Sequence, residues 1–253
     1  MAAKRLFRED INGIHHLVLN NGSNALGPKL MDELSNALAE LRETGCPPVL
    51  LRSSNRMLFC PGWDLKHLAG ADRVAVAETL SGFNRLILDL FSYPAPTGAA
   101  IGGHAVAGGC LLAMCCDVRI MVTGRPRIGL SELNLGVPVP ASSLLMLRQR
   151  LAPNVVEGLV VGGDGYNADR ARSLRVVHRA IDLKRVVSET GRELARLASR
   201  PPMAFAATKR FLLGDAWNRM AEPQAAENEV FLDCWFSPET QTRLGGIMER
   251  LGV

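Results

Sequence analysis

Apolar and polar residues alternate with two different periods in the first part of the chain. Residues 14–20 (IHHLVLN) have the apolar content of a strand and run into the turn-forming NNGSN. Over about 28–43, leucines recur at helical spacing with charged residues on the opposite face, and Pro47–Pro48 stops the helix. Residues 49–52 then predict a second strand.

The same alternation continues through the middle of the chain. The pattern predicts a Gly- and Pro-containing loop ending in a short helix (56–68), a helix (73–91), a strand (98–104), a helix (108–116) and a strand (117–122). Strands that alternate with helices favour an α/β core.

The last part of the chain is almost entirely helical in pattern. From about residue 142, only a short strand at 176–181 interrupts it. Residues 183–250 carry three or four amphipathic helices. Their predicted breaks are at Pro201–Pro202, Gly214 and Ser237–Pro238. Such a tail could cover the core or pack on a neighbouring subunit.

Composition and charge narrow the function classes. The 253 residues are 47% apolar and 21% charged, which suits one large domain or a core with an appendage. The net charge is +4 with Lys and Arg scattered, which argues against a nucleic-acid-binding protein. The first ten residues turn acidic and polar before any apolar stretch forms, so we expect no secretory signal there, and no run approaches the ~20 apolar residues of a membrane helix. We expect a soluble cytoplasmic protein with no nucleic-acid or membrane partner, compatible with an anionic small ligand.

The six cysteines give no sign of a metal site. They form no CxxC pair and have no metal-ligand spacing with histidine. Four lie in apolar or Gly-rich surroundings, where cysteine usually behaves as a small buried hydrophobe. We expect reduced thiols and no bound metal.

Three stretches carry candidate chemistry, and the first is 58–65 (LFCPGWDL). Gly62 lets the backbone turn tightly and come close to a ligand. The alternative is an ordinary loop that leads into a helix, with Asp64 near the N-cap.

The second stretch is 107–114 (AGGCLLAM). Paired glycines at the start of an apolar helix can aim backbone N–H groups and the positive end of the helix dipole at negative charge. Close packing of a buried helix against a strand also needs small residues and is the alternative. The spacing is neither a dinucleotide fingerprint nor a P-loop.

The third stretch, 128–136 (IGLSELNLG), contains one acid, Glu132, among apolar and small residues. A buried glutamate is costly unless it is paired or protonated, and loss of water raises its pKa toward the range of a general base. The alternative is a partly exposed glutamate at a turn, paired with Arg127.

Together the stretches resemble the crotonase (enoyl-CoA hydratase/isomerase) superfamily over nearly the whole chain. The motifs follow the family's order and spacing: N-A-L at 24–26, F-x-x-G-x-D-L at 59–65, the G-G-C helix at 108–112 and the acid-bearing segment at 129–136. The resemblance implies an α/β fold, a superhelix of β-β-α turns at 1–195, with a helical, trimer-forming C-terminal region at 196–253. A homotrimer or a dimer of trimers is expected.

The resemblance also implies a site with no metal and no separate cofactor, because coenzyme A is part of the substrate. The backbone N–H groups of Trp63 and Gly108 would form an oxyanion hole, each contributing roughly 3–4 kcal/mol, and Glu132 would be the acid–base residue. The residues expected to flank coenzyme A or the substrate are Ala25, Leu26, Cys60, Pro61, Gly62, Asp64, Leu65 and Ser131.

One position separates branches of the family. Its hydratases hold a water with two glutamates; the first position is Leu111 here, and the second is Glu132. Leucine removes a ligand for that water, whereas a double-bond shift needs one carboxylate. The chain also resembles the Δ3,Δ2-enoyl-CoA isomerase branch at G-G-C-L and at I-G-L-S-E, where Ser131 replaces a frequent Asn.

The sequence therefore favours an isomerase that shifts a 3-enoyl-CoA to a 2-enoyl-CoA in fatty acid oxidation. One alternative is an enoyl-CoA hydratase, or another lyase or hydrolase that forms an enolate. A different class of alternative is a non-catalytic acyl-CoA-binding protein, against which the retained Glu132 argues.

Other polar residues are assigned structural roles. His104 is expected to be a buried or edge histidine satisfied by backbone, and Cys60 to serve packing. Asp117 is expected to anchor the strand that follows it. Lys209 could reach coenzyme A phosphates, although a solvated helix face is preferred. Arg175 stands where the family has glycine and suggests a locally different loop.

Overall fold

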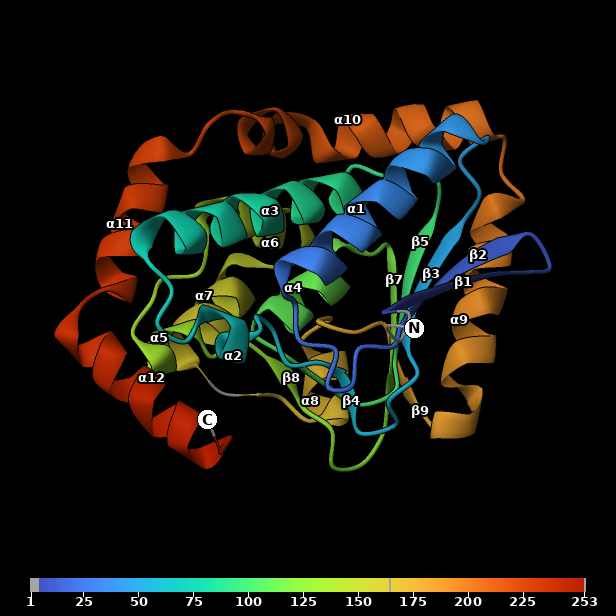
Figure 1. Cartoon of the computed structure of the whole chain (residues 1–253). Helices are drawn as coiled ribbons and strands as arrows, with labels where there is room; N and C mark the ends of the chain where they lie inside the picture. Colours follow the sequence, from blue (N-terminus) through green and yellow to red (C-terminus); the bar gives the residue numbers. More distant parts are fainter. Residues whose placement is uncertain (1–4, 164, 253) are drawn as a thin grey trace.

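The computed structural model describes residues 5–163 and 165–252, and its strands form two sheets (Figure 1). The strands are β1 (Leu6–Ile11), β2 (Ile14–Leu19), β3 (Val49–Ser53), β4 (Leu58–Cys60), β5 (Thr97–Ile101), β6 (His104–Val106), β7 (Val118–Val122), β8 (Ile128–Gly129) and β9 (Arg179–Ile181). The larger sheet has the order β1-β2-β3-β5-β7-β9 and the smaller β4-β6-β8. β1 pairs antiparallel with β2, and the other pairs are parallel.

Helices cover both faces of the larger sheet. They are α1 (Pro28–Glu43), α2 (Leu65–Leu68), α3 (Arg73–Phe91), α4 (Gly108–Cys115), α5 (Glu132–Leu135), α6 (Ala141–Arg150), α7 (Pro153–Gly162), α8 (Ala168–Ser173), α9 (Leu183–Ala198), α10 (Pro202–Ala221), α11 (Ala225–Trp235) and α12 (Pro238–Arg250). In Figure 1, α9 lies along one face of the sheet, and α1, α3 and α4 lie on the other. Gly98 of β5 permits the close approach of α9, because a Cβ there would lie 2.8 Å from the Thr190 Cγ2. The predicted α/β core is confirmed.

The predicted strand 98–104 is wrong, because two strands occupy this stretch. β5 ends at Ile101 in the larger sheet, whereas β6 starts at His104 in the smaller one. Gly103 permits this change of sheet, since a Cβ there would lie 2.4 Å from the carbonyl carbon of Met57. The same approach lets the His104 N–H donate to the Met57 oxygen at 2.9 Å. The switch places the start of α4 directly after the smaller sheet.

Three further strands differ from the sequence pattern. β1 was not predicted, because its apolar residues Leu6, Phe7 and Ile11 do not alternate with polar ones, and only Leu6 is buried. β4 has three residues and lies within the predicted loop 56–68. The strand predicted at 176–181 is shorter, since only 179–181 pair in the sheet as β9. The helices predicted at 28–43 and 73–91 are confirmed.

The C-terminal helices α10, α11 and α12 follow one another around the outside of the molecule (Figure 1). All three predicted breaks are confirmed: α10 starts at Pro202, Gly214 interrupts it with φ +37°, and Ser237 caps α12. α9 continues through residue 195 to Ala198. The division at 195–196 into a core and a C-terminal region stays a prediction.

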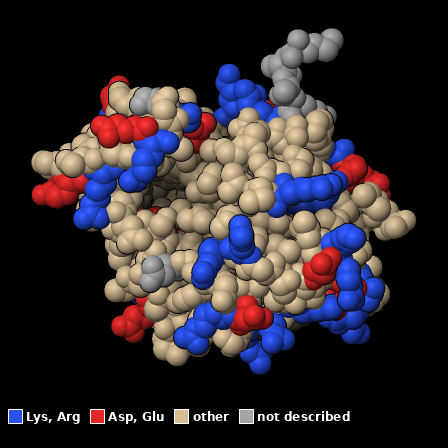
Figure 2. All heavy atoms as spheres, turned by 90° about the horizontal axis from the view of Figure 1, so that it is seen from below, with Lys and Arg blue, Asp and Glu red and all other residues tan. Residues whose placement is uncertain are grey.

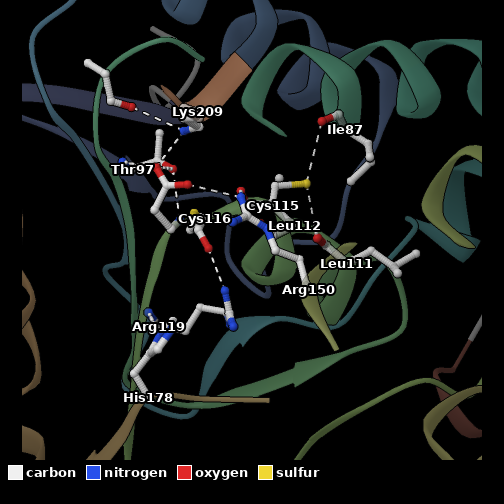
Figure 3. Close-up of polar contacts among 12 residues, drawn as sticks. Ile87, Thr97, Leu111, Leu112, Cys115, Cys116, Arg119, Arg150, His178 and Lys209 are labelled. Carbon is white, nitrogen blue, oxygen red and sulfur yellow. Dashed lines mark hydrogen bonds and ion pairs between the residues drawn. The ribbon is translucent and has the colours of Figure 1, made fainter. Parts of the chain in front are cut away.

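A buried ionic cluster joins α10 to the core (Figure 3). Lys209 Nζ lies 2.6 Å from the Asp117 carboxylate, and an Arg150 nitrogen lies 3.1 Å from its other oxygen. Burial alone would raise the pKa of Asp117, but these two cations outweigh it and hold the pKa below its ordinary value. Thr97 donates to the same carboxylate from its N–H and its O–H, both at 3.0 Å.

This cluster corrects the predictions for Lys209 and for the partner of Asp117. Lys209 is 6% exposed, so a contact with coenzyme A phosphates and a solvated helix face are both wrong for it. The role of Asp117 is structural, as expected, but its carboxylate bonds to β5, α6 and α10 rather than to the strand that follows it. The residues next to Lys209 in the sequence could not indicate this partner, because Asp117 belongs to a distant segment of the chain.

Within residues 5–163 and 165–252, no helix is both long enough and apolar enough to span a bilayer. In the same part of the chain, no group of three or more His, Cys, Asp or Glu side chains is placed to hold a metal ion.

Candidate active site

A cavity of about 290 Å³ lies between the loop after β4, the start of α4, the short helix α5 and the C-terminal helices α11 and α12. Figure 2 shows the molecule hollowed beside the C-terminal helices, with Lys and Arg side chains along the edge of the hollow. The polar and charged residues that line the cavity are Ser131, Glu132, Asn134 and Arg250. Its other lining residues are Pro61, Trp63, Leu65, Phe83, Ala107, Gly108, Leu135, Val137, Pro140, Phe231, Trp235 and Ile247. The fold thus brings all three stretches with candidate chemistry to one largely apolar cavity.

The loop after β4 holds the Trp63 backbone in a fixed orientation. The Leu26 N–H donates to the Gly62 oxygen at 2.8 Å, and the Asp64 N–H donates to the Leu26 oxygen at 3.1 Å. Leu26 and Trp63 therefore form a parallel bridge. Because successive amides in extended backbone point to opposite sides, the Trp63 N–H points away from Leu26. It donates no hydrogen bond to any other described residue.

Gly62 brings this loop against the start of α4. Its φ of +97° lies in the region that favours glycine. A Cβ at Gly62 would lie 3.1 Å from the Gly108 nitrogen and 3.0 Å from the Ala107 Cβ. The amides of Trp63 and Gly108 therefore belong to segments in direct contact.

The Gly108 N–H is the first of α4, and the first amides of a helix have no partner within it. Ala107 precedes it with φ 50° and ψ −127°, a strained conformation of the kind that clusters at functional sites. A hydrogen bond from the Ala107 N–H to the Gly129 oxygen, 2.9 Å long, holds it there. Gly109 serves packing instead, since a Cβ would lie 2.0 Å from the Cys60 oxygen. The packing interpretation therefore applies to Gly109, whereas the use of the Gly108 N–H to bind negative charge stays a prediction.

Glu132 is the first residue of α5 and lines the cavity, where it is partly exposed. Burial raises the pKa of its carboxyl to about 7, although a hydrogen bond from the Ser131 N–H to Oε2, 2.8 Å long, acts in the opposite direction. The alternative pairing with Arg127 is not observed, because that guanidinium contacts the Gly165 oxygen at 3.5 Å. A carboxyl with a pKa near neutrality can both accept and return a proton.

The C-terminal helix fixes the turn that carries this acid. α5 is a single turn of four residues, too short to be stable by itself. Thr240 of α12 is fully buried and donates to the Gly136 oxygen at 3.1 Å. Arg243 donates to the Asn134 oxygen at 2.6 Å. The position of the carboxylate therefore depends on α12 as well as on its own segment.

Leu111, at the position where the family's hydratases carry their first glutamate, also has apolar surroundings in the structure. Leu111 is 0% exposed within the main hydrophobic core. Among the described residues that line the cavity, Glu132 is the only Asp or Glu.

The residues expected to flank coenzyme A or the substrate fall into two groups. Pro61, Leu65 and Ser131 line the cavity, whereas Ala25, Leu26, Cys60, Gly62 and Asp64 lie outside its lining. The part of both groups in binding coenzyme A stays a prediction.

Two of the outer residues have visible structural roles. Asp64 accepts from the His67 N–H at 3.3 Å and caps α2, as the alternative interpretation of this loop proposed. Cys60 is completely buried, and burial raises the pKa of its thiol to about 12, so the expected packing role is confirmed.

The structure also shows the local surroundings of His104 and the backbone conformation of Arg175. His104 Nδ1 accepts a hydrogen bond from the Arg127 N–H at 3.2 Å, so the expected satisfaction by backbone is confirmed. Arg175 has φ +59°, which means that the turn keeps a conformation favouring glycine despite the arginine.

Sequence reasoning missed the residues that reach the cavity from helices far along the chain. Phe83 comes from α3, Phe231 and Trp235 from α11, and Arg250 from the end of α12. On an amphipathic helix, an aromatic residue that lines a cavity has the same periodic signal as one in the core. No feature of the sequence marks these aromatic residues as different.

Comparisons with known proteins match the chain as a whole. The family described as Enoyl-CoA hydratase/isomerase matches residues 9–250. The chain is 35% identical over 172 residues to the enoyl-CoA hydratase domain-containing protein 2, mitochondrial, of Mus musculus, a match that covers 67% of this chain and 58% of that protein. It is 30% identical over 189 residues to carnitinyl-CoA dehydratase of Proteus mirabilis, covering 74% of this chain and 71% of that protein.

A solved structure extends the likeness to the whole fold. The human mitochondrial delta3-delta2-enoyl-CoA isomerase superposes with a TM-score of 0.93 at 25% identity, over 98% of both chains. With the family match over residues 9–250, this shows that the chain belongs to the enoyl-CoA hydratase/isomerase family and has the crotonase fold.

Proposed function

We propose that the protein is an enoyl-CoA isomerase that shifts the double bond of a 3-enoyl-CoA to the 2-position with a single glutamate. The observation that carries the proposal is the cavity lining, in which Glu132 is the only Asp or Glu among the described residues. Membership of the family supports an acyl-CoA thioester as the substrate. Coenzyme A would enter as part of that substrate, and no separate cofactor is needed for the reaction.

The reaction would use two backbone amides and one carboxylate. The thioester oxygen accepts hydrogen bonds from the Trp63 and Gly108 N–H groups. The Glu132 carboxylate takes a proton from C2, which forms a dienolate whose negative charge develops on that oxygen. Donors preorganised for such a charge contribute about 10²- to 10³-fold each to the rate.

The second half of the reaction returns the same proton. As the dienolate collapses, the C1 carbonyl re-forms from the oxygen lone pair, the C1–C2 double-bond electrons move to C2–C3, and the C3–C4 electron pair becomes available at C4. The protonated Glu132 carboxyl then donates its proton to C4, which gives the conjugated 2-enoyl-CoA and restores the carboxylate. A carboxyl with a pKa of about 7 suits both steps, because neither of its forms is strongly favoured near neutral pH.

A hydratase remains the principal rival, since the family contains both activities. Hydration needs a held water and a proton donor besides the base, and an apolar Leu111 removes one group that could hold that water. A non-catalytic acyl-CoA-binding protein is the rival of another class. The raised pKa and the position of Glu132 beside two free amides favour catalysis over binding alone.

Product analysis separates these functions. We expect 3-hexenoyl-CoA to be converted to 2-hexenoyl-CoA, with the appearance of the conjugated thioester followed by ultraviolet absorbance and the products identified by mass spectrometry. Crotonyl-CoA should yield little 3-hydroxybutyryl-CoA under the same conditions. Hydration of crotonyl-CoA as fast as isomerisation would contradict the proposal, and so would binding without exchange of the C2 proton in deuterated water.

The pH dependence provides a separate check on the acid–base residue. We expect kcat/KM for isomerisation to rise with pH and to level off above about pH 7, because the base that takes the C2 proton must be ionised and burial raises the pKa of Glu132 to about 7. The measurement is initial rate at low substrate concentration across the pH range. A profile that is flat from about pH 5 to about pH 9 would contradict this expectation, because it would mean that no group with a pKa near 7 controls the reaction.

A further inference from the structure

Trp63 contributes to the cavity twice. Its backbone N–H is one of the two free amides, and its indole ring lines the same cavity. Both groups are attached to one α-carbon, so the indole must lie within a few bond lengths of a thioester oxygen bound to that amide. The residue that supplies this N–H therefore also supplies, with its side chain, the first part of the cavity surface that the acyl chain would meet.

The Trp63 ring packs against three other aromatic rings from two helices. Its centroid lies 5.8 Å from that of Phe83, 5.4 Å from Phe231 and 5.9 Å from Trp235. Phe231 and Trp235 stack at 6.3 Å. Centroid separations of about 4.5–7 Å are those of aromatic rings in contact. The four rings, here called the aromatic wall, therefore form a continuous surface.

Contacts between α3 and α11 hold this surface in place. Arg73 of α3 lies 2.6 Å from Glu229 and 2.7 Å from Asp233 of α11. Asn84 of α3 donates to Asn228 of α11 at 3.5 Å. Exposed ion pairs are individually weak, but together with the packed rings they oppose movement of α11 away from the cavity.

The cavity has a polar edge and an apolar interior, which orients an acyl-CoA within it. Coenzyme A carries several phosphate charges, and Lys and Arg side chains border the hollow (Figure 2). The aromatic wall is apolar and suits a hydrocarbon chain. At about 290 Å³, the cavity is also at the lower limit of the ~300–1,000 Å³ that is usual for ligand pockets.

We infer that the aromatic wall closes the acyl end of the cavity and makes the enzyme specific for short-chain acyl-CoA thioesters, with Trp63 as the residue that determines chain length. The inference rests on the proposed function, because it places the thioester oxygen at the Trp63 amide.

The test compares two reactions and two binding equilibria. The ratio of kcat/KM for 3-hexenoyl-CoA to that for 3-dodecenoyl-CoA is measured for the wild type, Trp63→Ala and Trp235→Ala. The ratio of Kd for lauroyl-CoA to that for butyryl-CoA, two saturated thioesters, is measured by calorimetry on the same proteins. Trp217→Ala is the matched control, because Trp217 packs against the core and under Arg210, 4.1 Å from its ring, and does not line the cavity.

We expect the wild type to favour the short thioester by about 10-fold or more in both ratios. Trp63→Ala, which keeps its backbone N–H, should lower both ratios by about 10-fold, and Trp235→Ala should act in the same direction from a different helix. Trp217→Ala should leave them unchanged. Circular dichroism identifies a variant that fails to fold, in which case the other variant decides.

Two outcomes overturn the inference: lauroyl-CoA that binds the wild type as tightly as butyryl-CoA, or folded wall variants that keep the wild-type ratios. Loss of the proposed isomerase activity is a distinguishable result. If no 3-enoyl-CoA is isomerised but the binding ratio shifts in the wall variants, the specificity of the aromatic wall is supported and the reaction assignment fails.

Discussion

Replacing Glu132 with glutamine should lower kcat/KM for 3-enoyl-CoA isomerisation about 10²- to 10⁴-fold, the usual contribution of a positioned acid–base group. Glutamine keeps the size of the side chain and can still occupy the site beside the Ser131 N–H, but it cannot accept the C2 proton. The measurement is kcat/KM with 3-hexenoyl-CoA for the purified variant and the wild type. Because the two backbone amides remain, some activity above the uncatalysed rate should survive.

The control for this variant is Glu43→Gln, at the exposed end of α1, which should keep wild-type activity. A stability measurement shows that the loss is not due to unfolding. The pKa of Glu132 is raised from 4.5 to about 7 by burial, so the neutral form stabilises the fold at low pH and that stability is lost as pH rises through about 7. The variant should therefore match the wild type near pH 4 and be more stable than it above about pH 7. Activity close to that of the wild type would end the proposed mechanism.

Replacing Lys209 with methionine should lower the free energy of unfolding by about 3–5 kcal/mol, the usual cost of removing one partner from a buried ion pair. Lys209 is 6% exposed, and its Nζ lies 2.6 Å from the Asp117 carboxylate. Methionine is of similar length but leaves the buried carboxylate with Arg150 as its remaining cationic partner in the cluster (Figure 3). Denaturant unfolding of the wild type and the variant measures the change.

Two comparisons give this prediction its specificity. Lys184→Met removes an exposed lysine from α9 and should change stability by less than about 0.5 kcal/mol. The double variant Asp117→Asn, Lys209→Met should lose less than the sum of the two single variants, because the two residues share one interaction. A loss of under about 1 kcal/mol for Lys209→Met would mean that the cluster is in effect solvated.

Short segments of the sequence were enough to predict the parts of the site that depend on local backbone. Gly62 has the positive φ that its motif required, and Gly108 begins α4 with a free N–H. Glu132 stands out because it is a lone acid in an apolar stretch, and its raised pKa agrees with that pattern. The isomerase proposal rests on Leu111, whose buried, apolar surroundings agree with the residue type. These features follow from residues that are neighbours in the chain.

Other parts depended on contacts between distant segments and were missed or mistaken. Lys209 looked like a surface residue because its partner, Asp117, is 92 positions away. The strands β1 and β4 are too short or too exposed to show a period of their own.

The sequence by itself determined the family, the α/β order of elements, the proposed catalytic acid and the glycines of the proposed oxyanion hole, because each is encoded in residue type and near spacing. Only the tertiary structure decided how the indole of Trp63 meets Phe231 and Trp235, and how α12 fixes the turn that carries Glu132. Periodicity shows which face of a helix is apolar, but not whether that face meets the core or a cavity. That choice is made when separate helices pack together.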